Sequence, residues 1–288
     1  MPAAAGHSIR QQLDWAAGIL ESISCSARLD SEVLLAHCLQ KNRSYLMTWP
    51  ERELDQLQLS CFQELVRRRL QPLPIAYLVG EKEFYSLTLK TTPATLVPRP
   101  ETEMLVDKVL QMTQTITTPR ILELGTGTGA IALSIKQHSA GSEILATDVS
   151  TEALQVAREN AQTHQLDIDF RLSDWFSEIE PEPCFDVIVS NPPYIDELDP
   201  YLSQGDLPAE PRQALVSADH GMQALTEIIA KGKGYLKPGG WLVLEHGYDQ
   251  REPVNQLLSA HGYVQVETFQ DFNQLPRMSI GQKVLNPS

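Results

Sequence analysis

The 288-residue sequence has no long apolar run, few cysteines and no excess of positive charge. Because no stretch of 18 apolar residues occurs, we expect no transmembrane helix. Residues 1–7 lack a basic segment followed by an apolar one, so no signal peptide is expected. The cysteines lack CxxC pairing, which excludes a zinc module or a disulfide framework and predicts reduced thiols in a cytoplasmic protein. They are Cys25, Cys38, Cys61 and Cys184.

The net charge and the chain length further restrict the kind of protein that this sequence can encode. Lysine plus arginine number 23 against 37 for aspartate plus glutamate, which gives a formal net charge of −14. An acidic protein is poorly suited to gripping phosphate backbones, although a local basic patch is compatible with this balance. At about 150 residues per domain, the length predicts about two domains.

Residues 1–74 predict only helices. The apolar face of a first helix comprises Ile9, Leu13, Ala16 and Leu20. A second helix is expected to begin with Asp30 as its N-cap. A third, residues 53–70, is expected to end in the solvated run Arg67–Arg69 before Pro72. Its predicted apolar face comprises Leu54, Leu57, Cys61, Phe62, Leu65 and Leu70. We predict a small all-α N-terminal domain, a candidate docking module for a large substrate.

After residue 74 the pattern changes. Residues 75–98 predict a β-hairpin and a proline-rich linker, and residues 99–288 alternate between strand and helix, which predicts an α/β fold with a mostly parallel sheet. The candidate strands are 121–124, 143–147, 168–172, 185–190, 241–245, 264–268 and 278–284. The candidate helices are 101–112, 131–138, 152–163, 222–235 and 250–261. The last two strands have no helix between them, so they should be antiparallel.

A glycine-rich turn follows the first strand of this sheet. It consists of Gly125, Thr126, Gly127, Thr128 and Gly129. Glycines permit a close approach of a ligand to the backbone, and the helix behind them offers free N–H groups. The next strand ends at Asp148, which is placed to accept hydrogen bonds from both ribose hydroxyls of a nucleoside. We expect a nucleoside cofactor, and the turn alone leaves open whether it is NAD or S-adenosyl-L-methionine.

Glu123, two residues before the first glycine, favours S-adenosyl-L-methionine over NAD. The string Glu123-x-Gly125-x-Gly127-x-Gly129 resembles motif I of the class I S-adenosyl-L-methionine-dependent methyltransferases. This resemblance implies a Rossmann-like seven-stranded sheet, S-adenosyl-L-homocysteine as a product, and an acidic residue near the adenine after the third strand. Asp174 is the candidate acid there, and Trp175 can supply an aromatic face or be a core aromatic.

The tetrapeptide Asn191-Pro192-Pro193-Tyr194 directly follows the strand 185–190. A planar nitrogen is a poor nucleophile because its lone pair is delocalised, so an enzyme that methylates one must accept hydrogen bonds from its N–H groups and aim it. Asn191 offers a side-chain carbonyl, Pro192 offers a backbone carbonyl, and Tyr194 can supply a flat face. We predict a catalytic loop that acts by orientation and electrostatics, without a dedicated base.

Similar tetrapeptides occur in methyltransferases that act on exocyclic amines of nucleic acids and in those that act on protein glutamine. The acidic net charge and the acidic, proline-rich loop 190–221 disfavour DNA, as does the lack of an evident DNA-recognition domain. The segments 96–103, 210–215 and 244–247, together with the helical domain and the tetrapeptide, closely resemble the peptide chain release factor glutamine methyltransferases.

That second resemblance implies methyl transfer from S-adenosyl-L-methionine to the side-chain amide nitrogen of the glutamine in the Gly-Gly-Gln motif of release factors. It implies that residues 125–129, Asp148, Asp174, Trp175 and Asn191 bind the cofactor and that residues 191–194 bind the glutamine. A glutamine methyltransferase of a ribosomal protein and an exocyclic-amine DNA or RNA methyltransferase are the alternatives. No metal, membrane or direct nucleic-acid partner is expected, and we expect a monomer.

Three further residues have open roles. Arg99 and Glu103 are expected either to contact the substrate or fix the domains, or to be a solvated arginine and a favourable acid in a first helical turn. His246 ends a strand near the site, where a structural histidine with satisfied hydrogen bonds is more typical than a proton acceptor.

Overall fold

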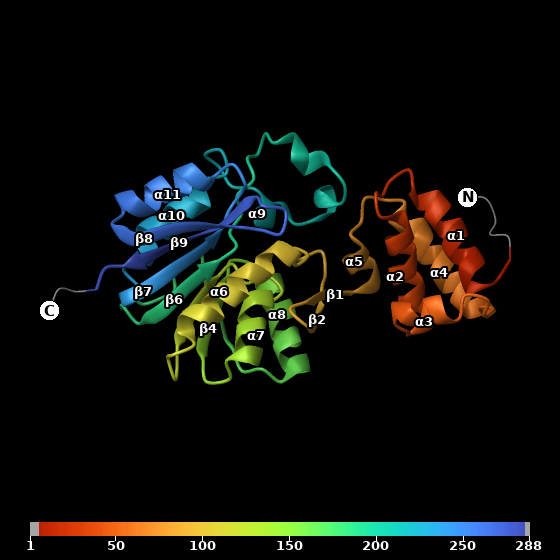
Figure 1. Ribbon diagram of the computed structural model, residues 1–288, viewed down its shortest axis with the longest axis horizontal. Helices are drawn as coiled ribbons and strands as arrows, with labels where there is room; N and C mark the ends of the chain where they lie inside the picture. Colours follow the sequence, from red (N-terminus) through yellow and green to blue (C-terminus); the bar gives the residue numbers. More distant parts are fainter. Residues whose placement is uncertain (1–5, 286–288) are drawn as a thin grey trace. The chain divides into compact units, whose positions relative to one another are not determined.

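The computed structural model describes residues 6–285, so the expectations for residues 1–5 and 286–288 lie outside it. The chain forms two compact units (Figure 1). One comprises the residues up to Glu81 together with Pro200–Ala209, and the other comprises Lys82–Asp199 and the residues from Glu210 onward. Among the helices within residues 6–285, none combines the length and the apolar character needed to span a bilayer.

The first unit is a helical bundle. Its helices are α1 (Ile9–Leu20), α2 (Ala27–Leu39), α3 (Arg43–Thr48), α4 (Gln56–Arg69) and α5 (Ile75–Val79). Two 3₁₀ turns, η2 (Pro200–Ser203) and η3 (Leu207–Ala209), complete it. Helix α4 begins where the Asp55 carboxylate accepts from the Gln58 backbone N–H and the Gln58 side chain accepts from the Asp55 N–H, a reciprocal cap that fixes this start. Leu34, Leu35 and Phe62 are fully buried between the helices.

Three sequence predictions for this unit were wrong. Helix α2 begins at Ala27, and Asp30 is buried within its first turn instead of capping it. Arg69 is buried as the partner of Asp30 and Asp206, so the Arg67–Arg69 run is not a solvated helix end throughout. Leu57, which is 83% exposed, and Cys61, which is also exposed, do not belong to the apolar face of α4. A buried charge needs a counter-ion, which outweighs the local capping preference of Asp30.

The expectation that all cysteines are reduced was also wrong. Cys38 of α2 and Cys61 of α4 form a disulfide, with Cα atoms 6.1 Å apart. They lie 23 residues apart in the sequence, and the packing of α2 against α4 brings them together. Cys25 and Cys184 are free thiols.

The second unit contains a hairpin, β1 (Glu81–Phe84) and β2 (Leu87–Lys90), and a seven-stranded sheet. The sheet strands are β3 (Arg120–Leu124), β4 (Glu143–Asp148), β5 (Asp169–Leu172), β6 (Phe185–Ser190), β7 (Leu236–Glu245), β8 (Tyr263–Gln270) and β9 (Pro276–Lys283). Their order is β5-β4-β3-β6-β7-β9-β8, and β9 runs antiparallel to both β7 and β8. The seven predicted strands and the antiparallel final pair are confirmed.

Helices cover both faces of this sheet (Figure 1). They are α6 (Glu103–Thr113), α7 (Ala130–His138), α8 (Thr151–His164), α10 (Gln223–Gly232) and α11 (Arg251–Ala260), with short α9 (Arg212–Leu215) and the 3₁₀ turn η1 (Pro100–Thr102). Adjacent residues of a strand face opposite sides, so Ile121 packs with α6 and α7 while Leu122 packs with α10 and α11. The strand order reverses between β3 and β6, where ligands bind in sheets of this kind.

Candidate active site

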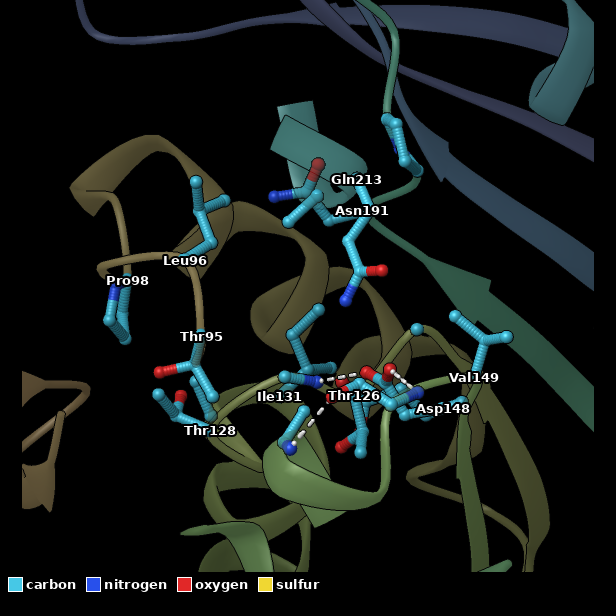
Figure 2. Close-up of a pocket in the computed structure, with 18 of the residues that line it drawn as sticks. Thr95, Leu96, Pro98, Thr126, Thr128, Ile131, Asp148, Val149, Asn191 and Gln213 are labelled. Atoms are coloured by element: carbon cyan, nitrogen blue, oxygen red, sulfur yellow. Dashed lines mark hydrogen bonds between the residues drawn. The ribbon is translucent and has the colours of Figure 1, made fainter. Parts of the chain in front are cut away.

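The carboxyl ends of four parallel strands lie side by side. Leu124 pairs with both Thr147 and Ser190, and Ser190 pairs with Leu244. The residues that follow these strand ends therefore share one edge of the sheet, where a cavity opens (Figure 2). The predicted residues that line the cavity are Arg99, Gly125, Thr126, Gly127, Thr128, Asp148, Asp174, Trp175, Asn191 and Pro193.

The glycine turn has the backbone conformation that its composition predicts. Gly125, Gly127 and Gly129 have φ values of 73°, 55° and 82°, a region that other residues rarely adopt. Gly129 does not line the cavity and lies instead against residues of α7 and α8. A Cβ atom there would lie 3.0 Å from Leu133 Cδ1 and 3.3 Å from Ala157 Cβ. Gly127 has no atom within 4 Å of such a position, which leaves its backbone open to a ligand.

Asp148 connects the glycine turn to the end of β4. One carboxylate oxygen accepts from the Gly127 N–H and the other from the Ser150 N–H, each at 2.9 Å. Each oxygen keeps a second lone pair that a ligand hydroxyl could use. Burial raises the pKa of this carboxyl above its usual value, and the backbone N–H groups counteract that effect.

Glu123 is a cavity residue that the site prediction did not include. It is 1% exposed, and its Oε2 accepts from the Thr126 hydroxyl at 2.7 Å and from the Ala132 N–H at 3.1 Å. Burial raises the pKa of this carboxyl to about 8. Its place at the start of the Glu-x-Gly string was the available signal.

Trp175 and Asp174 follow β5 and face the cavity. The Trp175 ring lies beside the glycine turn, since a Cβ atom on Gly125 would be 3.7 Å from Trp175 Cζ3. The neighbouring Phe176 packs into the core and stacks on Tyr235 with ring centroids 4.5 Å apart. The backbone of Trp175 has a φ of 47°, a left-handed conformation that is uncommon for a residue other than glycine.

The Asn191–Tyr194 loop places only part of its predicted surface in the cavity. Asn191 and Pro193 line it, and Figure 2 shows the Asn191 side chain pointing into it. Pro192 and Tyr194 are not among the lining residues. The Tyr194 hydroxyl donates to Glu245 Oε1 at 3.1 Å, and burial raises its pKa well above the usual value, so it remains a donor.

A polar chain runs from Asn191 into the protein. Asn191 Nδ2 donates to Thr102 Oγ1 at 3.2 Å, and the Thr102 hydroxyl donates to Glu245 Oε2 at 2.7 Å. Burial raises the pKa of Glu245 to about 7. Thr102 and Glu245 were not predicted as site residues, although both lie in segments that carry the family resemblance.

Arg99 and Glu103 have different surroundings. Arg99 lines the cavity and pairs with Glu210, whose side chain is 1% exposed and also accepts from the Val97 N–H at 2.9 Å. This pair fixes the segment before α6 to the start of α9. Glu103 accepts from the Tyr85 N–H at 2.9 Å and is not among the lining residues, so its predicted substrate contact has no support here.

His246 is fully buried, and both ring nitrogens have partners. Nδ1 lies 2.8 Å from the Gly247 carbonyl and Nε2 lies 2.8 Å from Ser279 Oγ. Burial lowers its pKa, so the ring is neutral near pH 7. These contacts are those of a structural histidine, the more typical of the two expected roles.

Known proteins resemble both units. Residues 11–80 match the family model of the PrmC N-terminal domain, and residues 100–205 match that of the methyltransferase small domain. The release factor glutamine methyltransferase of Aliivibrio fischeri is 45% identical over 264 residues, covering 91% of this chain and 93% of the relative. That of Escherichia coli is 43% identical over 258 residues, covering 89% and 92%. A methyltransferase structure from Pyrococcus furiosus, 18% identical with a TM-score of 0.51, covers 77% of this chain and 98% of its own, which shows the fold.

Proposed function

The chain belongs to the release factor glutamine methyltransferase family, and we propose that it methylates the side-chain amide nitrogen of the glutamine in the Gly-Gly-Gln motif of a release factor. The observation that carries this proposal is the position of Asn191. Its amide points into the same cavity that the glycine turn and Asp148 line. We also propose that the enzyme acts in the cytoplasm as a monomer.

The residues around the cavity fit S-adenosyl-L-methionine as the methyl donor. When bound, this cofactor supplies a methyl group on a sulfonium sulfur and leaves as S-adenosyl-L-homocysteine. Gly125 and Gly127 allow a ligand to approach the backbone, and Asp148 has lone pairs for ribose hydroxyls. Trp175 offers an aromatic surface beside Asp174, which can accept from an exocyclic amine.

The loop at the end of β6 orients the acceptor nitrogen. In this proposal Asn191 Oδ1 and the Pro192 carbonyl accept the two N–H groups of the glutamine amide, which turns its lone pair toward the methyl group. Of these two residues, Asn191 lines the cavity and Pro192 lies outside its lining. As nitrogen gains the methyl group it becomes cationic, so these hydrogen bonds strengthen in the transition state. The proton then leaves readily, and no dedicated base is required.

The test measures transfer of labelled methyl from S-adenosyl-L-methionine to two substrates in parallel. One is a release factor with an intact Gly-Gly-Gln motif, and the other is a mixture of duplex and single-stranded DNA. We expect label on the glutamine alone, located by peptide mass. Label on DNA would refute the proposal, and label on neither would direct the assay to a ribosomal-protein glutamine.

A variant pair tests the loop itself. Asn191→Ala should keep cofactor affinity within a few-fold and lose about 10²–10³-fold in kcat, the usual effect of removing one oriented polar group. The matched control is Asn255→Ala, because Asn255 contacts Thr268 away from the cavity. Turnover of Asn191→Ala close to that of the control would remove this loop from the mechanism.

A further inference from the structure

Glu245, Thr102 and Asn191 form a hydrogen-bonded chain whose inner end is sealed from solvent. Glu245 is 2% exposed and Thr102 is 5% exposed. The chain joins three separate elements, since Glu245 ends β7, Thr102 belongs to η1 and Asn191 follows β6. Of the three side chains, Thr102 and Asn191 line the cavity and Glu245 does not.

The direction of each hydrogen bond follows from the number of hydrogens available. An ionised carboxylate only accepts, so Glu245 takes the single hydroxyl hydrogen of Thr102. Thr102 Oγ1 can then only accept from Asn191, which requires Nδ2 of the amide on that side. The opposite atom of the amide, Oδ1, is thereby left to serve the cavity as an acceptor.

The Glu245 carboxylate is itself held from both sides. Its other oxygen accepts from the Tyr194 hydroxyl at 3.1 Å, and the Tyr194 carbonyl accepts from Gln250 Nε2 at 2.9 Å. Gln250 in turn accepts from the Gly247 N–H at 2.8 Å. With both oxygens engaged, the carboxylate has no free rotation that would release Thr102.

We propose that Glu245 and Thr102 are positioning residues that hold the Asn191 amide with Oδ1 toward the substrate, so that the site selects a glutamine amide over a glutamate carboxylate. This inference rests on the proposed function. The amide nitrogen of a glutamine donates a hydrogen bond to Oδ1. A carboxylate in the same place has only acceptor oxygens, so it cannot form a hydrogen bond with Oδ1. A flipped Asn191 would present Nδ2, which donates a hydrogen bond to the carboxylate.

Substitutions that change the number of hydrogen-bond donors in this chain test the positioning role. In Glu245→Gln the new amide can donate to Thr102, which frees the threonine hydrogen for Asn191 Oδ1 and permits the flip. Thr102→Val removes the hydroxyl, and Thr102→Ser keeps it. We expect kcat to fall about 10- to 100-fold in Glu245→Gln and Thr102→Val, a smaller loss than that expected for Asn191→Ala, which removes the oriented amide itself. In Thr102→Ser, kcat should stay within about threefold of the wild type. Thr113→Val is the matched control, because Thr113 is a buried threonine whose hydroxyl donates to the Val109 carbonyl of its own helix.

The second readout is specificity, which a merely structural role would not change. The affinities of two release factors are compared for each enzyme, one with Gly-Gly-Gln and one with glutamate replacing that glutamine. The wild type should bind the glutamate form more weakly. In Glu245→Gln and Thr102→Val, this ratio should fall by about fivefold or more as the amide becomes free to flip.

The pH profile gives a third readout. Tyr194 from the β6 loop, Glu101 from η1 and Arg277 from β9 are the charged or titratable groups that face Glu245. Protonation of Glu245 lets the carboxyl donate to Thr102, so kcat of the wild type should fall as the pH drops through about 7. The Glu245→Gln variant should lack this limb.

The outcomes separate the two proposals. If the wild type leaves the release factor glutamine unmethylated, the proposed function fails. If the wild type methylates it but the variants keep kcat within about threefold of Thr113→Val, the positioning role is overturned. A fall in kcat with an unchanged ratio of affinities also overturns it, because that would be a packing effect. Should Glu245→Gln fail to fold, Thr102→Val and Thr102→Ser decide between these results.

Discussion

Replacing Arg69 by methionine tests how much a buried ion pair stabilises the helical unit. Arg69 Nε lies 3.1 Å from Asp30 Oδ2, with 6% and 8% of the two side chains exposed. Arg69 Nη1 lies 2.9 Å from Asp206 Oδ1, whose side chain is 29% exposed. Methionine fills much of the same volume but leaves the buried Asp30 charge without its counter-ion, with a hydrogen bond from the Ser26 hydroxyl to Oδ1 remaining.

The expected loss comes mainly from Asp30. Removing one partner of a buried pair costs about 3–5 kcal/mol, because the remaining charge stays out of water. Asp206 adds little, since solvent screens a partly exposed pair. Hydrogen exchange of the α2 and α4 backbone amides measures the opening free energy of this unit alone, and protection should fall about 10²–10³-fold or more.

Two further variants identify the cause. Arg67→Met removes the neighbouring arginine of α4, which pairs with Glu64 at the surface, and should change protection much less. Asp30→Leu combined with Arg69→Met removes both charges and should recover most of the lost protection, because an apolar pair carries no desolvation cost. Equal losses in Arg69→Met and Arg67→Met would refute the reasoning, as would a double variant no more stable than Arg69→Met.

Three further predictions concern other parts of the chain. Cys61→Ser should lower the unfolding free energy of the helical unit by about 3 kcal/mol, because the disulfide closes a loop of about 23 residues. The intact mass of the wild type after alkylation should show two blocked thiols, those of Cys25 and Cys184. Gly129→Ala should cost about 1–2 kcal/mol of stability by thermal unfolding, since its φ of 82° and the Leu133 contact both penalise a Cβ atom. Gly127→Ala shares the φ penalty but meets no neighbouring atom, so it should cost less stability and should also weaken cofactor binding in calorimetry. Because the native pKa of Glu123 is raised from 4.5 to about 8, the native state retains a proton that the unfolded state releases, so stability should decline as the pH rises from about 5 to 8, and Glu123→Gln should flatten this decline. A steeper decline in Glu123→Gln than in the wild type would contradict the assignment.

Much of the α/β unit could be predicted because its signals are local. Each strand is a short apolar run bounded by turn residues, and each helix has its own periodic face. The glycine string and the Asn191 loop were placed at strand ends by sequence order alone. The register Leu124 to Ser190 then brings them together, as expected for parallel neighbours.

The contacts between distant segments could not be predicted. Arg69 and Asp206 lie 137 residues apart, and Thr102 and Glu245 lie 143 residues apart. Nothing in the local pattern of Asp30 distinguishes a helix cap from a buried counter-ion. Tyr194 was expected to present a flat face to the substrate, but its hydroxyl is bound to Glu245.

The sequence by itself determined the succession of strands and helices along the chain, the family and the two motifs that meet at the cavity. Hydrophobic periodicity and turn residues are local signals, each contained within a few residues. Only the tertiary structure decided which polar groups face each other across those elements. Burial makes such pairings strong, since an unpartnered charge or amide out of water is costly, and it is the packing of separate segments that determines what is buried. The orientation of Asn191 belongs to this second kind, because it depends on a threonine and a glutamate from two other segments.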